Sequence, residues 1–174
     1  MRQIITTYYL EQTDPAQLCP ARPAPALMLM RAEEPSPELG RFLYTAVGGN
    51  WYWTDRLSWD YARWLARLSR PGIETWVGYV AGTPVGYFEL DHEGESVEIA
   101  YFGLVPRFIG RGLGGALLTA AIQRGWALGV SRVWVHTCSL DGPTALANYQ
   151  ARGMRQYKLE QHEAELADAP PGPW

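Results

Sequence analysis

Three strand-like segments follow one another in the middle of the chain with almost no residues between them. Residues 74–81, 84–91 and 96–104 are rich in β-branched and aromatic side chains, which favour strands. The links Gly82-Thr83 and Glu93-Gly94-Glu95 are too short to hold a crossover helix, so successive strands must run antiparallel. The sequence therefore predicts a sheet built around an antiparallel meander.

Helix-like segments flank this meander in the sequence, so we expect a mixed α/β protein. Ser36 is a suitable N-cap for the first helix and Asp141 for the last, and glycine follows the end of each. The predicted elements outside the meander are strands 4–10, 27–32, 132–138 and 156–162 and helices 36–47, 58–68, 112–128 and 143–152.

Length and composition limit the function classes. The 174 residues, 47% hydrophobic and 19% charged, fit one folded domain, which we place at residues 1–168, with a flexible proline-rich tail at 169–174. A net charge of −3 argues against a broad nucleic-acid-binding face. We see no signal peptide and no apolar stretch near the about 20 residues that span a membrane. Cys19 and Cys138 fit free thiols better than a long-range disulfide, so we expect a cytoplasmic protein.

The most informative segment is Leu104–Leu118, where a predicted strand runs into a glycine loop that opens a helix. The loop is Gly110-Arg111-Gly112-Leu113-Gly114-Gly115. Glycines let the backbone approach a ligand and adopt positive φ, and the free N–H groups of the first helical turn point at one spot together with the helix dipole. This arrangement predicts an anion site suited to phosphate.

The loop has two other interpretations. Gly110-x-Gly112-x-x-Gly115 also matches the dinucleotide fingerprint of NAD-dependent oxidoreductases. The loop follows an antiparallel meander, however, Pro106 interrupts the approach, and no acidic residue stands near the end of the next strand to bind a ribose. The third interpretation is a glycine turn that only allows the helix and the strand to pack.

The segment Val97–Leu118, together with Ala145-Leu146-Ala147-Asn148-Tyr149-Gln150-Ala151-Arg152-Gly153-Met154, resembles the GNAT superfamily of acyl-CoA-dependent N-acyltransferases. In register with the family's glycine motif, Gly112 and Gly114 are the paired glycines. The place that usually holds Gln or Arg is Ile109, and Arg107 or Arg111 would have to supply that cation. The order of elements from residue 27 to 154 fits the same fold.

This resemblance implies a mostly antiparallel six- to seven-stranded sheet with helices on both faces. It implies an N-acetyltransferase that takes acetyl-CoA as cosubstrate, uses no metal, and acetylates the primary amine of a small molecule or peptide; a homodimer is compatible with it. A non-catalytic acyl-CoA-binding module on the same fold is the alternative function.

The resemblance also implies site residues. Tyr149, four residues before Gly153, is the expected acid for the thiolate, with a core tyrosine as the plainer interpretation. Glu98 is the expected base, and strict alternation would place it on one strand face with Ala100, Phe102 and Leu104. A solvent-facing role for Glu98, or Glu89 as the base, stays open.

The cofactor is expected to follow the same strand and loop. The backbone of Phe102, Gly103 and Leu104 would hold its pantetheine arm where the strand parts from its parallel neighbour. The loop residues would hold its pyrophosphate: Gly110, Arg111, Gly112, Leu113, Gly114 and Gly115. An asparagine contact common in the family falls at Gly142, so it is absent here or shifted to Asp141 or Asn148.

No motif identifies the acceptor, but one segment is unusually aromatic. Residues 50–59 hold four aromatic side chains, and we predict that Trp51 and Trp53 form an acceptor wall, with Asp55 available for a second charge. This favours an acceptor with an apolar or aromatic part beside its amine. His136 and Cys138 share a strand face, but two ligands without a second pair do not make a metal site.

Overall fold

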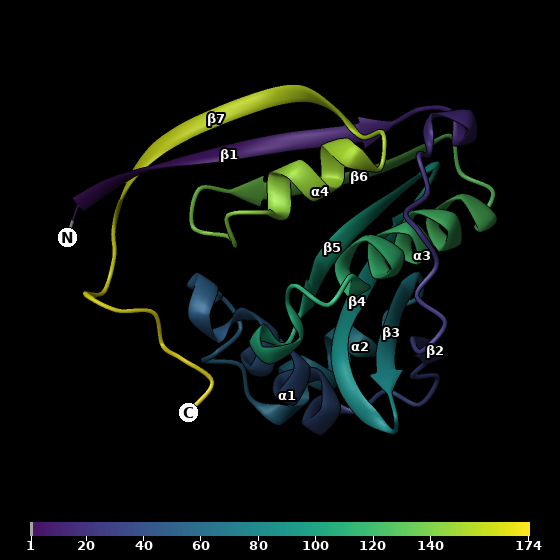
Figure 1. Cartoon of the computed structure of the whole chain (residues 1–174). Helices are drawn as coiled ribbons and strands as arrows, with labels where there is room; N and C mark the ends of the chain where they lie inside the picture. The colour runs from purple at the N-terminus through teal and green to yellow at the C-terminus, as the bar shows by residue number, and fades with distance from the viewer. Residues whose placement is uncertain (1) are drawn as a thin grey trace.

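A computed structural model describes residues 2–174, and within this range the strands form one seven-stranded sheet in the order β2-β3-β4-β5-β6-β1-β7 (Figure 1). The strands are β1 (Arg2–Gln12), β2 (Met28–Arg31), β3 (Ile73–Val80), β4 (Thr83–Glu93), β5 (Ser96–Leu104), β6 (Arg132–Cys138) and β7 (Arg155–Glu165). The helices are α1 (Pro37–Gly48), α2 (Tyr61–Leu68), α3 (Leu113–Ala127) and α4 (Ala145–Ala151), with single 3-10 turns at Pro15–Gln17, Gly49–Trp51 and Pro106–Phe108.

The predicted meander is confirmed as β3, β4 and β5, joined by tight antiparallel turns. Ala81 and Gly82 both have positive φ (49° and 78°), the conformation that a two-residue hairpin turn needs to match the strand twist. Every neighbouring pair in the described sheet is antiparallel except β5 with β6, which is parallel and joined through α3. The expected fold, a mostly antiparallel sheet in a mixed α/β protein, is therefore confirmed.

The helices cover both faces of the sheet. On one face α3 and α4 bury Leu117, Ile122 and Tyr149 against strand residues such as Phe88 and Val135. On the other face a smaller cluster joins α1 to β3 and β4; its buried members are Leu43, Val47, Val77 and Tyr87. Ser36 caps α1 as expected, because its hydroxyl accepts the Leu39 N–H.

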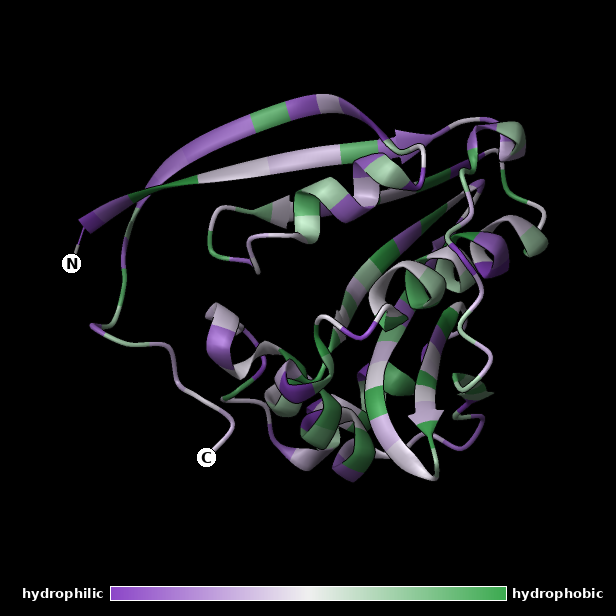
Figure 2. Ribbon diagram, viewed as in Figure 1, coloured by the Kyte–Doolittle hydropathy of each residue, from purple (hydrophilic) through white to green (hydrophobic). Residues whose placement is uncertain are grey.

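The N-terminal strand takes a position that local sequence cannot specify. β1 lies between β6 and β7 and pairs antiparallel with both, so the two ends of the chain complete one half of the sheet (Figure 1). β7 forms the outer edge, and Figure 2 shows it mostly hydrophilic along its length, in keeping with its exposed side chains. Polar edge strands resist pairing with other chains.

Asp141 does not cap α4, whose N-cap is Thr144; its carboxylate instead accepts from the Thr137 hydroxyl and the Cys138 N–H, because the turn after β6 brings them closer. The C-terminal segment forms no helix or strand, yet Gly172 donates its N–H to the Gly49 carbonyl. The domain boundary itself stays a prediction. Between residues 2 and 174, no helix is long and apolar enough to cross a membrane.

Candidate active site

β5 and β6 separate in the middle of the sheet. They pair in parallel only from Ser96 to Glu98, although β5 runs on to Leu104 and β6 to Cys138. The strands diverge because β5 stays in the meander while β6 follows β1 and β7 (Figure 1). The edge of β5 that faces the opening therefore has unpaired N–H and C=O groups from residue 99 onwards. A cleft of about 990 Å³ occupies the opening.

A β-bulge sets which side chains of β5 face which layer. Ile99 pairs with Leu90 and Tyr101 with Glu89, so Ala100 is an extra residue in the strand. The expectation that Glu98 shares a face with Phe102 and Leu104 is therefore wrong, because the bulge reverses the alternation between them.

The two sides of the bulge meet different helices. Glu98 lies opposite Asp91, which binds Arg67 of α2, so Glu98 faces the α1/α2 layer. Phe102 and Leu104 pack in the core cluster of α3 and α4. The cleft is lined from both layers.

The glycine loop lies where β5 ends and α3 begins. Gly110 and Gly112 have φ of 84° and 76°, a left-handed conformation that residues with a Cβ rarely adopt. Gly112 is the N-cap of α3 and supplies no side-chain hydrogen bond, so the first N–H groups of the helix are left for a ligand. Gly110, Gly114 and Gly115 line the cleft. These features are those of an anion site.

The six loop residues do not share one role in the structure. Leu113 is 6% exposed and packs into the core. A Cβ at Gly115 would lie 2.9 Å from the Cβ of Ala21, which cannot move aside as a long side chain can, so this glycine is needed for packing as well. The guanidinium carbons of Arg107 and Arg111 both lie over the Phe108 ring, at 4.7 and 4.9 Å.

Tyr149 of α4 reaches the cleft from the α3/α4 layer. Its ring is 5% exposed and meets Phe102 edge-on, with 5.9 Å between centroids. Within residues 2–174 no group hydrogen-bonds its hydroxyl. Burial, and then the charge of Asp141, raise the pKa of Tyr149, so the phenol keeps its proton at neutral pH. The adjacent Asn148 donates to the Gly114 carbonyl at 3.3 Å and ties α4 to α3.

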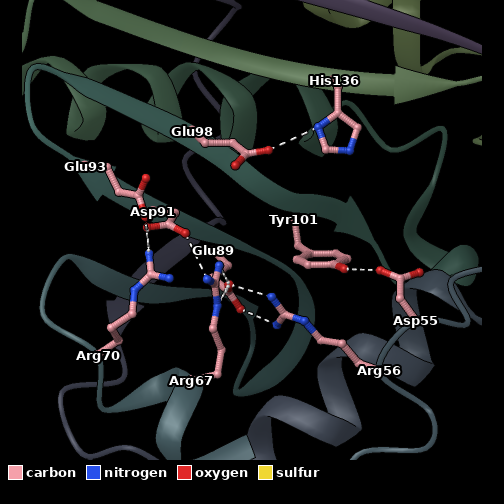
Figure 3. Close-up of polar contacts among 10 residues, drawn as sticks. All are labelled: Asp55, Arg56, Arg67, Arg70, Glu89, Asp91, Glu93, Glu98, Tyr101 and His136. Atoms are coloured by element: carbon pink, nitrogen blue, oxygen red, sulfur yellow. Dashed lines mark hydrogen bonds and ion pairs between the residues drawn. The ribbon is translucent and has the colours of Figure 1, made fainter. Parts of the chain in front are cut away.

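Glu89 and Glu98, the two carboxylates considered for the base, have different surroundings. Glu89 is 2% exposed and accepts from Arg56 at 2.7 and 2.9 Å and from Arg67 at 2.7 and 3.0 Å (Figure 3). Burial alone would raise the pKa of Glu89, but the bonds and charges of Arg56 and Arg67 outweigh burial and hold it below its ordinary value. Glu89 does not line the cleft, whereas Glu98 does.

Glu98 hydrogen-bonds a residue that sequence reasoning missed. Its Oε1 lies 3.1 Å from Nδ1 of His136, which stands on the separated part of β6 and also lines the cleft (Figure 3). The hydrogen bond to Glu98 raises the pKa of His136, partly offset by burial, and the charges of Asp141 and Asp55 add to the rise. The parallel register of β5 and β6 creates this pair, and no sequence pattern encodes that register.

Cys138, on the same face of β6, also lines the cleft. Burial, and then the charge of Asp141, raise its pKa, which keeps the thiol protonated. Both cysteines are free. In the part of the chain that the structure describes, no three His, Cys, Asp or Glu side chains converge as metal ligands.

Trp51 and Trp53 both line the cleft on the α1/α2 side. Trp53 packs against Tyr44 and Tyr101, with centroids 5.5 and 4.9 Å apart, and its Nε1 lies 3.3 Å from Asp141. Trp51 lies against Gly142, where a Cβ would be 3.4 Å from its ring. Both side chains therefore anchor the segment as well as bounding the cleft.

Further cleft residues complete this side. Tyr101 donates its hydroxyl to Asp55 at 2.7 Å (Figure 3). Trp59 and Arg56 also line the cleft, with the Arg56 guanidinium 4.8 Å from the Trp59 ring centroid. The sequence did not predict Arg56, Trp59 or Tyr101 as site residues, although Arg56 and Trp59 lie in the aromatic segment 50–59 and Tyr101 lies on the predicted strand 96–104.

The family model described as "Acetyltransferase (GNAT) family" matches residues 30–154. No curated protein matches the chain. Among solved structures, a GCN5-related N-acetyltransferase from Sphaerobacter thermophilus is similar at a TM-score of 0.71 and 18% identity, over 97% of this chain and 53% of that one. The ribosomal-protein-S18-alanine N-acetyltransferase from Escherichia coli is similar at 0.59 and 14%, over 76% and 79%.

An aminoglycoside acetyltransferase from an uncultured soil metagenomic sample, in complex with trehalose, is similar at a TM-score of 0.61 and 19% identity, over 73% of this chain and 87% of that one. The chain spans only 53–63% of the length of the first four structures matched. At these identities the similarities show a shared fold and do not transfer a substrate.

Proposed function

Because the chain belongs to the acetyltransferase (GNAT) family, we propose that it transfers an acetyl group from acetyl-CoA directly to the primary amine of a small molecule or peptide. The observation that carries this proposal is the cleft between β5 and β6, which joins the glycine loop to Tyr149 on one side and to Glu98 on the other. An acyl donor, an acceptor amine and groups for both proton transfers can meet there.

The residues present fit the cosubstrate. The loop around Gly110–Gly115 offers backbone N–H groups and a helix N-terminus to the pyrophosphate. The unpaired edge of Phe102, Gly103 and Leu104 offers N–H and C=O groups to the amides of the pantetheine arm, as an added strand would use them. One of these N–H groups also suits the thioester carbonyl oxygen, where negative charge develops during transfer.

The proposed proton transfers divide between the two sides of the cleft. The acceptor amine, with a pKa of about 10, is protonated at neutral pH and must lose a proton before it attacks. We assign proton removal to Glu98, directly or through a group that it hydrogen-bonds. Tyr149, whose raised pKa keeps its proton in place, is assigned to protonate the leaving thiolate.

The charges around the acceptor side favour a cationic amine with an apolar part. Arg56 and Arg67 are paired with Glu89 and Asp91, so their charges are compensated and do not repel a cationic amine. Trp51 and Trp53 offer flat apolar walls. The metagenomic aminoglycoside acetyltransferase acts on another acceptor class with the same fold, and we expect arylalkylamines or hydrophobic amino acids and peptides to be better acceptors here than aminosugars.

The test is an acetyl-CoA assay against a panel of arylalkylamines, amino acids, peptides, polyamines and aminosugars, read by released thiol. Tyr149→Phe should lower kcat on the best acceptor by roughly 10- to 1000-fold, with acetyl-CoA affinity unchanged by calorimetry. Tight acetyl-CoA binding without turnover of any amine would instead support the non-catalytic binding module. An unchanged kcat in Tyr149→Phe, with chemistry rate-limiting, would remove Tyr149 from the mechanism.

A further inference from the structure

We propose that the imidazole of His136 takes the proton from the acceptor amine and that Glu98 acts through it as a positioning residue. This inference rests on the proposed function and names the group that stands between Glu98 and the acceptor.

Glu98 and His136 stand on either side of the point where β5 and β6 separate. Glu98 is the last residue of β5 that pairs with β6, and its partner in register is Trp134. His136 follows two residues later, on the same face of β6 but past the point where the strands separate. The Glu98 side chain is 21% exposed and that of His136 is 47% exposed. Both residues line the cleft, and a larger fraction of the His136 side chain than of the Glu98 side chain is accessible.

The hydrogen bond between Glu98 and His136 determines the tautomer of the imidazole. A carboxylate only accepts, so the 3.1 Å contact requires the proton of the neutral imidazole to be on Nδ1. The lone pair then lies on Nε2, to which no side chain or backbone group of residues 2–174 is hydrogen-bonded. This is the tautomer that a proton acceptor needs, and the carboxylate stabilises the imidazolium that forms.

Three carboxylates act on the imidazole of His136. Glu98 of β5 contacts the ring, and Asp141 and Asp55 face it from the loop after β6 and from the aromatic segment. On β1, Tyr9 lies opposite His136, with 5.8 Å between ring centroids. Cys138, two residues along on the same face, keeps its thiol proton and is neutral.

The carboxylates of Glu98, Asp141 and Asp55 add negative charge around His136, in line with its raised pKa. Two cations lie one ring away from His136, and each is paired with a carboxylate. Lys158 of β7 lies on the Tyr9 ring at 4.6 Å and pairs with Glu160. Arg132 lies 5.4 Å from the Trp134 ring, which neighbours His136, and pairs with Glu11. A base whose pKa is raised accepts a proton from an ammonium group more readily.

Transfer forms a C–N bond and breaks the C–S bond, and the ammonium nitrogen loses two protons in all. His136 Nε2 takes the first proton before attack and releases it to water. The sulfur takes one proton from Tyr149, and the phenol recovers it from the second proton of the nitrogen through water. One proton is released for each acetyl group transferred.

The kinetic test compares pH profiles of kcat/KM for the full chain and its variants. For the unsubstituted chain, activity should rise with pH through the His136 pKa, because only the neutral ring accepts a proton. His136→Gln should lose this limb and about 100-fold or more of kcat/KM. Glu98→Gln should keep the limb, shifted to lower pH, with a smaller loss. His162 is an exposed histidine on β7, outside the cleft. His162→Gln is therefore the matched control, and its pH profile should equal that of the unsubstituted chain.

A second readout does not depend on turnover. The chain has three histidines, so the His136 signal in a proton NMR titration is assigned by its absence in His136→Gln. Its pKa should lie above the ordinary value of about 6.5 and fall in Glu98→Gln. An unmoved pKa in Glu98→Gln would show that the pair does not form in solution and would overturn the inference.

The kinetic outcomes separate the two proposals. If amines are acetylated and Glu98→Gln abolishes the limb while His136→Gln keeps it, Glu98 is the direct base and this inference fails while the proposed function stands. If the unsubstituted chain binds acetyl-CoA and acetylates no amine in the panel, the proposed function and this inference both fail.

Discussion

The ion pair between Glu89 and Arg56 allows a stability prediction with a magnitude. Both side chains are almost fully buried, with 2% and 5% exposed. Glu89→Gln would leave the Arg56 cation among aromatic rings, 4.2 Å from the Tyr101 centroid, with no other carboxylate bound to it in the described chain. Arg67 would keep Asp91 at 2.9 Å. Leaving one buried charge uncompensated lowers the free energy of unfolding by about 3–5 kcal/mol. In a chain of this size each kcal/mol lowers Tm by about 2–4 °C, so Tm should fall by roughly 6–20 °C.

The assay is urea unfolding followed by tryptophan fluorescence, with calorimetry for Tm. The matched control is Glu93→Gln, which removes the Arg70 partner whose side chain is 75% exposed and should cost at most about 1 kcal/mol. If Glu89→Gln is destabilised no more than Glu93→Gln, the reasoning from burial is refuted.

The same variant has a pH signature. Because the pKa of Glu89 is lowered in the native state, its stabilisation is complete above the ordinary carboxyl pKa of about 4.3 and is lost as pH falls through the native value. The stability difference between the unsubstituted chain and Glu89→Gln should therefore shrink on acidification. At temperatures below its Tm, Glu89→Gln should keep the acid limb of the pH profile of kcat/KM, since this carboxylate lies outside the cleft.

Two further predictions concern binding. Gly114→Asp should lower the affinity for acetyl-CoA by about tenfold or more in calorimetry, because its carboxylate would repel the phosphates, whereas its Cβ would meet only ordinary contacts at 3.6 and 3.8 Å. The control is Ala116→Asp, in the same turn but outside the cleft. Equal affinities of the two variants would rule out the loop as the phosphate site. Trp53→Ala should raise the acceptor KM and also lower the free energy of unfolding by up to about 3 kcal/mol, and with it Tm, because Trp53 packs on Tyr44. Trp51→Ala should mainly raise the acceptor KM. If neither variant changes this KM, both residues serve only as anchors.

The parts of the fold that local chemistry determines were predictable from the sequence. β5 and β6 have the predicted bounds, and the meander followed from its two short links. The glycine loop was placed correctly at the start of α3 because positive φ and a helix start have direct sequence signals. The position of β1 between β6 and β7 has no such signal, because pairing between the chain ends depends on packing over more than 100 residues.

The site was predictable in part for the same reason. Glu98, Tyr149, Trp51 and Trp53 do line one cleft, but the sequence did not predict His136 as a partner of Glu98. Finding the Glu98–His136 contact requires the register of two parallel strands joined through a helix, which side-chain periodicity does not give. The faces of β5 were misassigned because a one-residue bulge leaves no mark in an alternating pattern.

The bulge at Ala100 connects the fold to the proposed chemistry. Without the extra residue, regular alternation would place Glu98 on the same face as Phe102, against the apolar core under α3 and α4, where a carboxylate without a partner is costly. With it, Glu98 meets His136 on the α1/α2 side, while Phe102 holds Tyr149 on the other side. The proposed proton acceptor and proton donor then approach the strand opening from opposite faces of the sheet. An acyl group held between the strands would be reached by the amine from one layer while its sulfur stays near the other, so the two proton transfers need not compete for one group.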